Sequence, residues 1–152
     1  MTYEQKIKKA EECNIEIAYD FSNGENVVGI YKFFYCNENG EYCFYVGKST
    51  NIAYRLLGAS RGHIYMYLNN DFTNLVPLKI KEYLNEGYKI KVMIKEIDYR
   101  DISFTNAAHR LAYAELQEIV KYQEKGQCQF QVPEGSGTYE ELFWEENYKN
   151  KE

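Results

Sequence analysis

β-Branched and aromatic residues are concentrated in two neighbouring segments of the chain, residues 27–36 and 42–47. Short runs of this kind are typical of β-strands. Between them, Asn37-Glu38-Asn39-Gly40 carries the residue types that favour a tight turn. The pattern therefore predicts a β-hairpin.

A third strand is predicted for residues 89–97, where apolar and charged positions alternate. The side chains expected to point inward are apolar: Ile90, Val92 and Ile94. Those expected to point outward are lysines: Lys89, Lys91 and Lys95. Met93 is the one apolar exception on the expected outer face.

Helical periodicity and capping residues predict the remaining elements. The first helix follows a capping box formed by Thr2 and Gln5 and extends to about Glu12. The other predicted helices cover residues 51–60, 76–85, 103–124 and 139–148, with glycines closing the second and third of these. This order of elements indicates a small α/β (α+β) domain with a mostly antiparallel three-stranded sheet flanked by helices.

We expect a single domain over residues 1–131, with the first helix as an N-terminal extension, followed by an acidic extension over 132–152. The segment Pro133-Glu134-Gly135-Ser136-Gly137 separates the two. No apolar run reaches the roughly 20 residues that span a membrane, and the first residues lack the apolar core of a signal peptide. We therefore expect a cytoplasmic protein with no membrane partner.

The net charge of −5 is distributed unevenly. The extension over 132–152 accounts for most of it, with six glutamates and two lysines. Residues 42–70 contain no acidic residue, although four basic or titratable side chains fall inside: Lys48, Arg55, Arg61 and His63. Local fields govern the choice of partner more than the net charge does, so a nucleic-acid partner remains compatible with this composition.

The four cysteines, Cys13, Cys36, Cys43 and Cys128, show no CxxC spacing and no accompanying pair of histidines. This pattern does not indicate a zinc site. Cys36 and Cys43 flank the same predicted turn and could face each other. Free thiols are nevertheless the expected state in a cytosolic protein.

The longest predicted helix carries a carboxylate within its apolar stripe. At 100° per residue, the stripe comprises Phe104, Ala108, Leu111, Ala112, Ile119 and Tyr122. Glu115 lies at its centre, and Glu118 lies about 60° to one side. A carboxylate on a buried face is costly unless it is paired. Glu115 therefore indicates either an ion pair with an arginine or a ligand for a divalent cation.

Three basic or titratable residues each allow two interpretations. Arg55 lies ten residues after Tyr45 and is either an exposed helical arginine or an anion ligand. His63 is either a surface histidine or a member of a site. Lys48, which follows a strand, either contacts a phosphate or is solvated.

Together these residues resemble the GIY-YIG nuclease family. The resemblance consists of Gly29-Ile30-Tyr31, Tyr45-Val46-Gly47-Lys48-Ser49, Asn51, Arg55 and the helical Glu115, and it covers roughly residues 27–131. Each tripeptide alone is weak, whereas the ordered set with its spacing is specific. The predicted order of elements also agrees with the family's small α/β fold.

The resemblance implies hydrolysis of a DNA phosphodiester bond with one divalent ion, Mg²⁺ or Mn²⁺. Glu115 would be the metal ligand, Arg55 would hold the phosphate, Tyr31 would activate or orient the attacking water, and Tyr45 would belong to the same network. Lys48 and His63 would assist in proton transfer or phosphate contact. The further roles it implies are DNA contact by Lys48, Arg55, Arg61 and Gln129, and a structural role for Gly29 and Gly47.

Two features depart from the family pattern. The family places an asparagine after the glutamate helix, whereas this chain has no asparagine between Asn106 and Asn147. Gln127, Gln129 and Gln131 are the available amides. Thirteen residues also separate Tyr31 from Tyr45, which requires a longer hairpin loop than is common in the family.

The hairpin provides a test that is independent of the family. A two-residue turn at Asn39-Gly40 would point Tyr31 and Tyr45 to opposite faces, because side chains alternate along a strand. A shared site requires an odd loop, such as Glu38-Asn39-Gly40 with a bulge at Gly40.

The sequence therefore predicts a metal-dependent DNA endonuclease of the restriction-like or phage/mobile-element type. The N-terminal helix and residues 58–76 are the available room for DNA-recognition elements. A second interpretation is a catalytically inactive GIY-YIG-like module that binds nucleic acid or protein. The acidic extension and the missing asparagine favour it.

Overall fold

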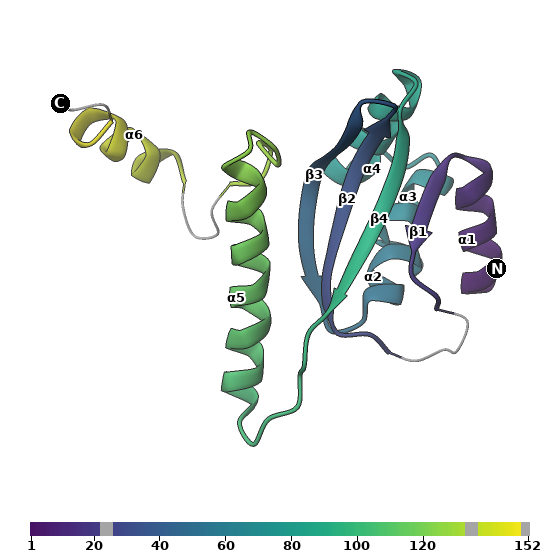
Figure 1. Cartoon of the computed structure of the whole chain (residues 1–152), viewed down its shortest axis with the longest axis horizontal. Helices are drawn as coiled ribbons and strands as arrows, with labels where there is room; N and C mark the ends of the chain where they lie inside the picture. The colour runs from purple at the N-terminus through teal and green to yellow at the C-terminus, as the bar shows by residue number, and fades with distance from the viewer. Residues whose placement is uncertain (22–25, 133–136, 150–152) are drawn as a thin grey trace.

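A computed structural model of the chain describes residues 1–21, 26–132 and 137–149. The elements follow in the order α1 (Tyr3–Glu12), β1 (Ile15–Ala18), β2 (Gly29–Asn37), β3 (Gly40–Ser49), α2 (Ile52–Leu57), α3 (His63–Leu68), α4 (Leu75–Asn85), β4 (Lys89–Glu96), α5 (Phe104–Gln123) and α6 (Thr138–Asn147). Within these residues the fold is α+β, with a four-stranded mixed sheet and six helices (Figure 1).

The sheet has the strand order β1-β4-β2-β3. β2 pairs antiparallel with both β3 and β4, and β1 pairs parallel with β4. The prediction of three strands is therefore wrong, because it omitted β1. This strand has four residues, of which Ile15 and Ile17 are buried, and so short a pattern is not distinctive in the sequence.

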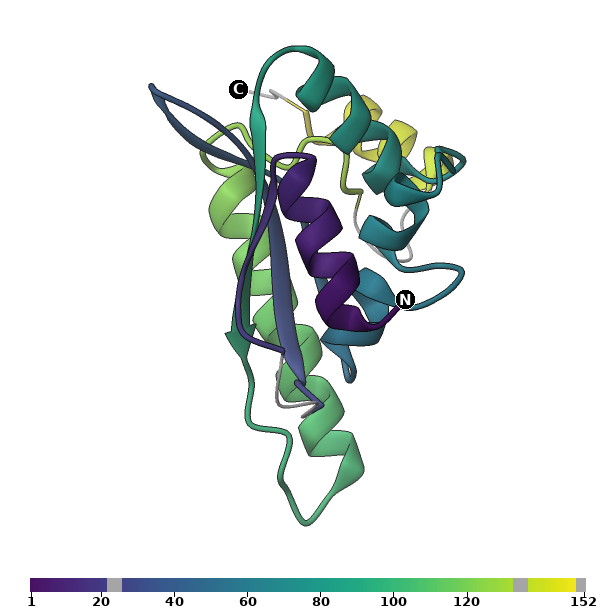
Figure 2. The same ribbon diagram turned by 90° about the vertical axis from the view of Figure 1, so that its right-hand side faces the viewer.

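The sheet separates two apolar cores. On one face, α1 to α4 pack over odd-numbered β2 residues such as Tyr31 and Phe33. On the other face, α5 packs over even-numbered residues such as Ile30 and Phe34. Figures 1 and 2 show α5 on the opposite side of the sheet from α1. Met93, the apolar exception of the third predicted strand, belongs to the α5 core, so its face of the sheet is also covered.

The predicted helices are confirmed with small shifts of their ends. The capping box of α1 is present, because Thr2 Oγ1 accepts from the Gln5 amide at 3.1 Å and Gln5 Oε1 accepts from the Thr2 amide at 2.8 Å. The helix predicted over residues 51–60 ends earlier, at Leu57 in α2. Residues 58–76, considered as room for DNA-recognition elements, contain α3, whose His63, Ile64 and Met66 are buried.

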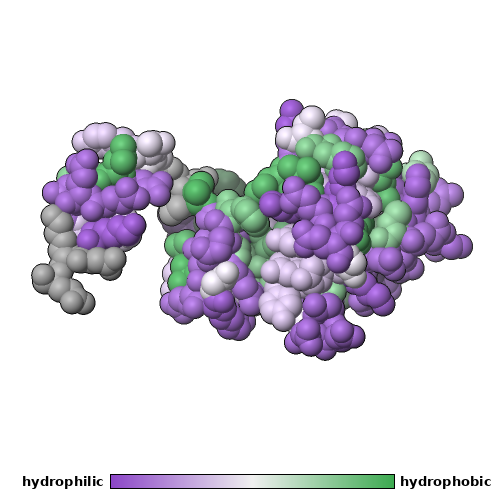
Figure 3. Space-filling view, turned by 90° about the horizontal axis from the view of Figure 1, so that it is seen from above, coloured by the Kyte–Doolittle hydropathy of each residue, from purple (hydrophilic) through white to green (hydrophobic). Residues whose placement is uncertain are grey.

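The C-terminal helix α6 has the predicted position along the chain. Its described side chains are exposed, and Figure 3 shows it at the left, beside the larger body. Residues 133–136 of the separating segment lie outside the described residues. None of the helices in the described part of the chain is both long and apolar enough to cross a membrane.

Candidate functional site

Tyr31, Tyr45 and His63 form an aromatic cluster on the face of the sheet that carries α1 to α4. The Tyr31 and Tyr45 rings stack with their centroids 6.2 Å apart. The His63 ring lies 5.5 Å from the Tyr31 ring and 5.6 Å from the Tyr45 ring. The Tyr31 hydroxyl and His63 Nε2 are hydrogen-bonded at 3.0 Å. Three separate segments, β2, β3 and the start of α3, thus converge.

A β-bulge places the two tyrosines on the same face. Phe33 pairs with Tyr45, but the next residue, Phe34, pairs with Cys43, so Phe44 is an extra residue in β3. An extra residue reverses the alternation of side chains on the strand beyond it. The Tyr45 side chain therefore lies on the same face of the sheet as the Tyr31 side chain.

The bulge was predicted at the wrong place. Asn37 pairs with Gly40, so the turn contains two residues, Glu38 and Asn39. A turn of even length alone would leave the tyrosines on opposite faces, as the sequence analysis argued. The shift in register occurs in the middle of β3, where no glycine marks it in the sequence.

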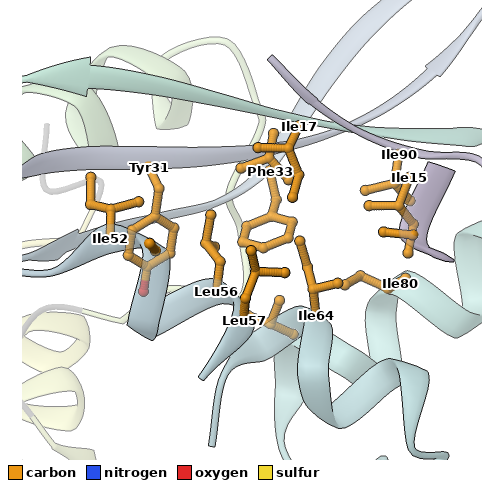
Figure 4. Packing of buried hydrophobic residues seen from close by; sticks show 14 of the residues in the cluster. Ile15, Ile17, Tyr31, Phe33, Ile52, Leu56, Leu57, Ile64, Ile80 and Ile90 are labelled. Atoms are coloured by element: carbon orange, nitrogen blue, oxygen red, sulfur yellow. The ribbon is translucent and has the colours of Figure 1, made fainter. Parts of the chain in front are cut away.

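Both motif glycines lie where a side chain would not fit. A Cβ at Gly47 would overlap the Tyr31 ring, and a Cβ at Gly29 would overlap the Lys95 carbonyl oxygen on β4. Figure 4 shows the Tyr31 side chain extending from β2 beside Ile52, with its hydroxyl at the end remote from the strand. These contacts support the structural role expected for the two glycines.

Arg55, on α2, places a positive charge next to the cluster. Its Nη1 donates to the Arg61 carbonyl oxygen at 3.0 Å, which positions the guanidinium. Its charge acts on the ionisation of Tyr31, Tyr45 and His63. Arg61 supplies its backbone to this contact, and its side chain is exposed.

Burial determines the protonation states of the cluster. It raises the pKa of Tyr31, and Tyr45 raises it further, whereas Arg55 lowers it. The pKa of Tyr45 is also raised, chiefly by burial. Burial and the charge of Arg55 lower the pKa of His63 to about 3. At neutral pH, both phenols therefore keep their protons, and the imidazole is uncharged.

Glu115, on α5, lies at the rim of the same region. Its carboxylate is 3.9 Å from Lys48 Nζ on β3, and the two side chains are 21% and 36% exposed. Its negative charge raises the pKa of Tyr31 and of Tyr45. The carboxylate therefore acts on both tyrosines and is also open to solvent.

The expectation that Glu115 occupies the centre of the buried stripe is wrong. The buried carboxylate on α5 is that of Glu118, which lies 3.7 Å from Lys32, 3.4 Å from Lys95 and 3.9 Å from Lys121. Three lysines compensate the loss of hydration of this carboxylate.

Of the remaining residues of the predicted stripe, Leu111 and Tyr122 are buried and Ala108 and Ile119 are half-buried, whereas two are not covered. The buried positions of the helix are Ala107, Leu111, Glu118 and Tyr122. Phe104 and Ala112, both assigned to the stripe, are exposed. The helix wheel could not fix the rotation, because it contains no information about the sheet that α5 packs against.

Two of the three candidate glutamines bind the edge strand of the sheet. The Gln131 amide accepts from the Val46 N–H and donates to the Val46 carbonyl, both at 2.7 Å. Gln127 Oε1 accepts from the Cys43 amide at 2.7 Å. Gln129, the expected DNA contact, is exposed and donates to the Gln127 carbonyl. Of the three glutamine side chains, that of Gln131 lies next to Tyr45-Val46-Gly47. Its amide group bonds to both backbone groups of Val46.

The described residues contain no group of three or more His, Cys, Asp or Glu side chains arranged to hold a metal ion. Mg²⁺ keeps several water ligands and is often bound through one or two carboxylates. The partly exposed Glu115 fits such a water-rich ion.

Comparison with known proteins gave no match: no family model, no curated protein and no solved structure matches the chain. The resemblance to the GIY-YIG family therefore rests on the named residues.

Proposed function

We propose that this protein is a divalent-metal-dependent endonuclease of the GIY-YIG type that hydrolyses DNA phosphodiester bonds, in a restriction-like or phage/mobile-element role. One observation carries the proposal: the bulge at Phe44 brings Tyr31 and Tyr45 together beside His63, within reach of the Arg55 and Glu115 charges. These residues are far apart in the sequence but close together in the fold. Packing of the sheet alone does not require polar groups at these positions.

Glu115 is the residue that would hold Mg²⁺ or Mn²⁺. A bound ion of this kind supplies charge neutralisation at a phosphate and stabilises the leaving oxygen. Lys48, 3.9 Å from the Glu115 carboxylate, adds positive charge on the same side of the site. Arg55 suits the phosphate oxygens, because its planar guanidinium can donate two parallel hydrogen bonds.

The protonation states assign Tyr31 an orienting role. Its raised pKa leaves few phenolate ions at neutral pH, so it acts by directing a water molecule through its hydroxyl oxygen. His63 Nε2, hydrogen-bonded to that hydroxyl, fixes its direction, and the low pKa of His63 makes it a weak proton acceptor. When Nε2 is the acceptor, the ring proton lies on Nδ1, which is buried and has no hydrogen-bond partner among the described residues.

Cleavage of supercoiled plasmid DNA in Mg²⁺ tests the proposal. Glu115→Gln and Tyr31→Phe should each lower the cleavage rate by about 100-fold or more, which corresponds to about 2.7 kcal/mol of transition-state stabilisation. Matched controls are Glu124→Gln, exposed at the C-cap of the same helix, and Tyr35→Phe, four residues along β2 on the same face. Both controls should cleave like the unchanged protein. Equal background cleavage by all five proteins contradicts the nuclease.

A second candidate is a catalytically inactive module of the same type that binds nucleic acid or protein. The observation favouring it is that Tyr31 is only 2% exposed, which suits a structural tyrosine. This alternative predicts salt-dependent DNA binding without cleavage in the assay above, with unchanged binding by Glu115→Gln.

A further inference from the structure

Two cysteines that are far apart in the sequence meet in the α5 core. The Sγ atoms of Cys43, on β3, and Cys128, after α5, are 3.4 Å apart and hydrogen-bonded. Both residues are buried, at 1% and 2% exposure. The sequence analysis instead considered Cys36 as a neighbour of Cys43. That pairing is absent, because Cys36 lies opposite Glu41 in the hairpin.

The backbone around the two sulfur atoms is held in place independently of them. The Cys128 amide donates to the Cys43 carbonyl at 3.1 Å. The side chains of Gln127 and Gln131, on either side of Cys128, bond to the backbone of β3 at 2.7 Å. These hydrogen bonds align the segment 127–131 along the edge strand, which holds the two sulfur atoms 3.4 Å apart in the folded chain.

We propose that Cys43 and Cys128 are a redox-active pair that closes to a disulfide when the protein meets a peroxide. Two thiols lose two protons and two electrons, the O–O bond of hydrogen peroxide breaks, and two water molecules form. In the first step one thiolate attacks a peroxide oxygen to give a sulfenic acid and water. In the second, the other sulfur attacks the sulfenic sulfur, the S–S bond forms and the second water leaves.

The hydrogen bond between the two thiols lowers the pKa of Cys128 and raises that of Cys43, which burial raises further. The thiolate is the nucleophilic form of cysteine, so whichever thiol ionises starts the exchange. A dithiol reductant reverses the reaction through a mixed disulfide.

The disulfide would join the segment after α5 covalently to β3. Tyr45 lies on β3, and the segment directly follows α5, which carries Glu115, so the bond would tie the end of α5 to the strand on the other side of the candidate site. The inference itself does not rest on the proposed function, because it concerns only the thiols and their surroundings.

Thiol mapping of the reduced full-length chain tests the inference. The protein is treated with one equivalent of hydrogen peroxide, remaining thiols are alkylated under denaturing conditions, and the protein is analysed by mass spectrometry. We expect alkylation of Cys13 and Cys36, a cross-linked peptide pair that contains Cys43 and Cys128, and recovery of all four thiols after dithiothreitol. Four alkylated thiols after peroxide, a cross-link through Cys36, or a sulfonic acid at Cys128 overturns the inference.

Thermal unfolding with matched variants provides the second measurement. Closing a long loop raises the melting temperature, and here we expect about 5 °C or more on oxidation of the unchanged protein. Cys36→Ser, the control, should show the same rise. Cys128→Ser should show none. A rise that survives in Cys128→Ser contradicts the proposed pair.

Discussion

Glu115 and Glu118 stand three residues apart on α5, yet they occupy two different regions of the molecule. Glu118 lies under the sheet, where three lysines surround its carboxylate. Glu115 lies at the rim, partly exposed, where its charge acts on Tyr31 and Tyr45. Glu118 is thus a buried carboxylate among three cations, whereas Glu115 is a partly exposed carboxylate beside polar groups. The difference between them is one of exposure and neighbours, which a helical wheel does not contain.

Glu118→Gln should produce the largest change in stability. The substitution leaves Lys32, of which only 12% of the side chain is exposed, without its counter-charge. Removing one partner of a buried ion pair costs several kcal/mol, and because the other two lysines can turn to water we expect about 2–3 kcal/mol. The free energy of unfolding in urea measures this loss.

The matched substitution Glu115→Gln sharpens the comparison. It should change the free energy of unfolding by less than about 0.5 kcal/mol, since its pair with Lys48 is long and partly exposed. The double variant Lys32→Met/Glu118→Leu should recover most of the stability lost in Glu118→Gln. Equal losses for the two glutamates would contradict the assignment of Glu118 as structural and Glu115 as available.

The pH dependence of stability should show an intermediate effect from His63. Its pKa is about 3 in the folded protein against an ordinary value of about 6.5. As the pH falls, the imidazole therefore binds a proton in the unfolded chain at a higher pH than in the folded protein. Stability is therefore lost as the pH falls from 6.5 towards 3, by about 1–2 kcal/mol between pH 7 and 5. His63→Gln should flatten this dependence.

The second histidine of the chain, His109, is the control. It is exposed on α5, so His109→Gln should keep the pH dependence of the unchanged protein. Denaturant unfolding of the three proteins at pH 7 and at pH 5 separates the two histidines. A flattened profile in His109→Gln but not in His63→Gln would refute the buried, uncharged state of His63.

Lys48→Met should have the smallest effect on stability, under about 0.5 kcal/mol, because its contact with Glu115 is long and partly exposed. Its effect should instead appear in DNA affinity, as a slope of binding against salt concentration that is lower by about one counterion. An unchanged slope would exclude Lys48 from the proposed DNA contacts. Lys9→Met, on the exposed part of α1, is the control.

Local sequence signals predicted most elements correctly. The Thr2–Gln5 capping box, the turn near Asn39, the alternation of β4 and the periodicity of α5 each depend on neighbouring residues, and each is confirmed. β1 and α3 were missed. β1 is too short for its alternation to be distinctive, and it exists as a strand only because β4 offers it a parallel edge.

The candidate site was predicted as a set of residues but not as an arrangement. His63, which allowed a surface interpretation, is buried against Tyr31. Gln131 was left among three possible amides, and its pairing with Val46 could not be read from spacing. Contacts of this kind depend on strand register, and the register depends on a bulge at Phe44 that carries no glycine or proline signal.

By itself, the sequence determined the list of strands and helices with strong local signals, the motif residues and the acid-free window around them. Only the tertiary structure decided that the two tyrosines share a face, that Glu118 and not Glu115 is buried, and that Cys43 meets Cys128. The physical reason is common to all three. Local propensity sets which backbone states a segment adopts, whereas the rotation of a helix and the register of a strand depend on the packing of distant segments against each other.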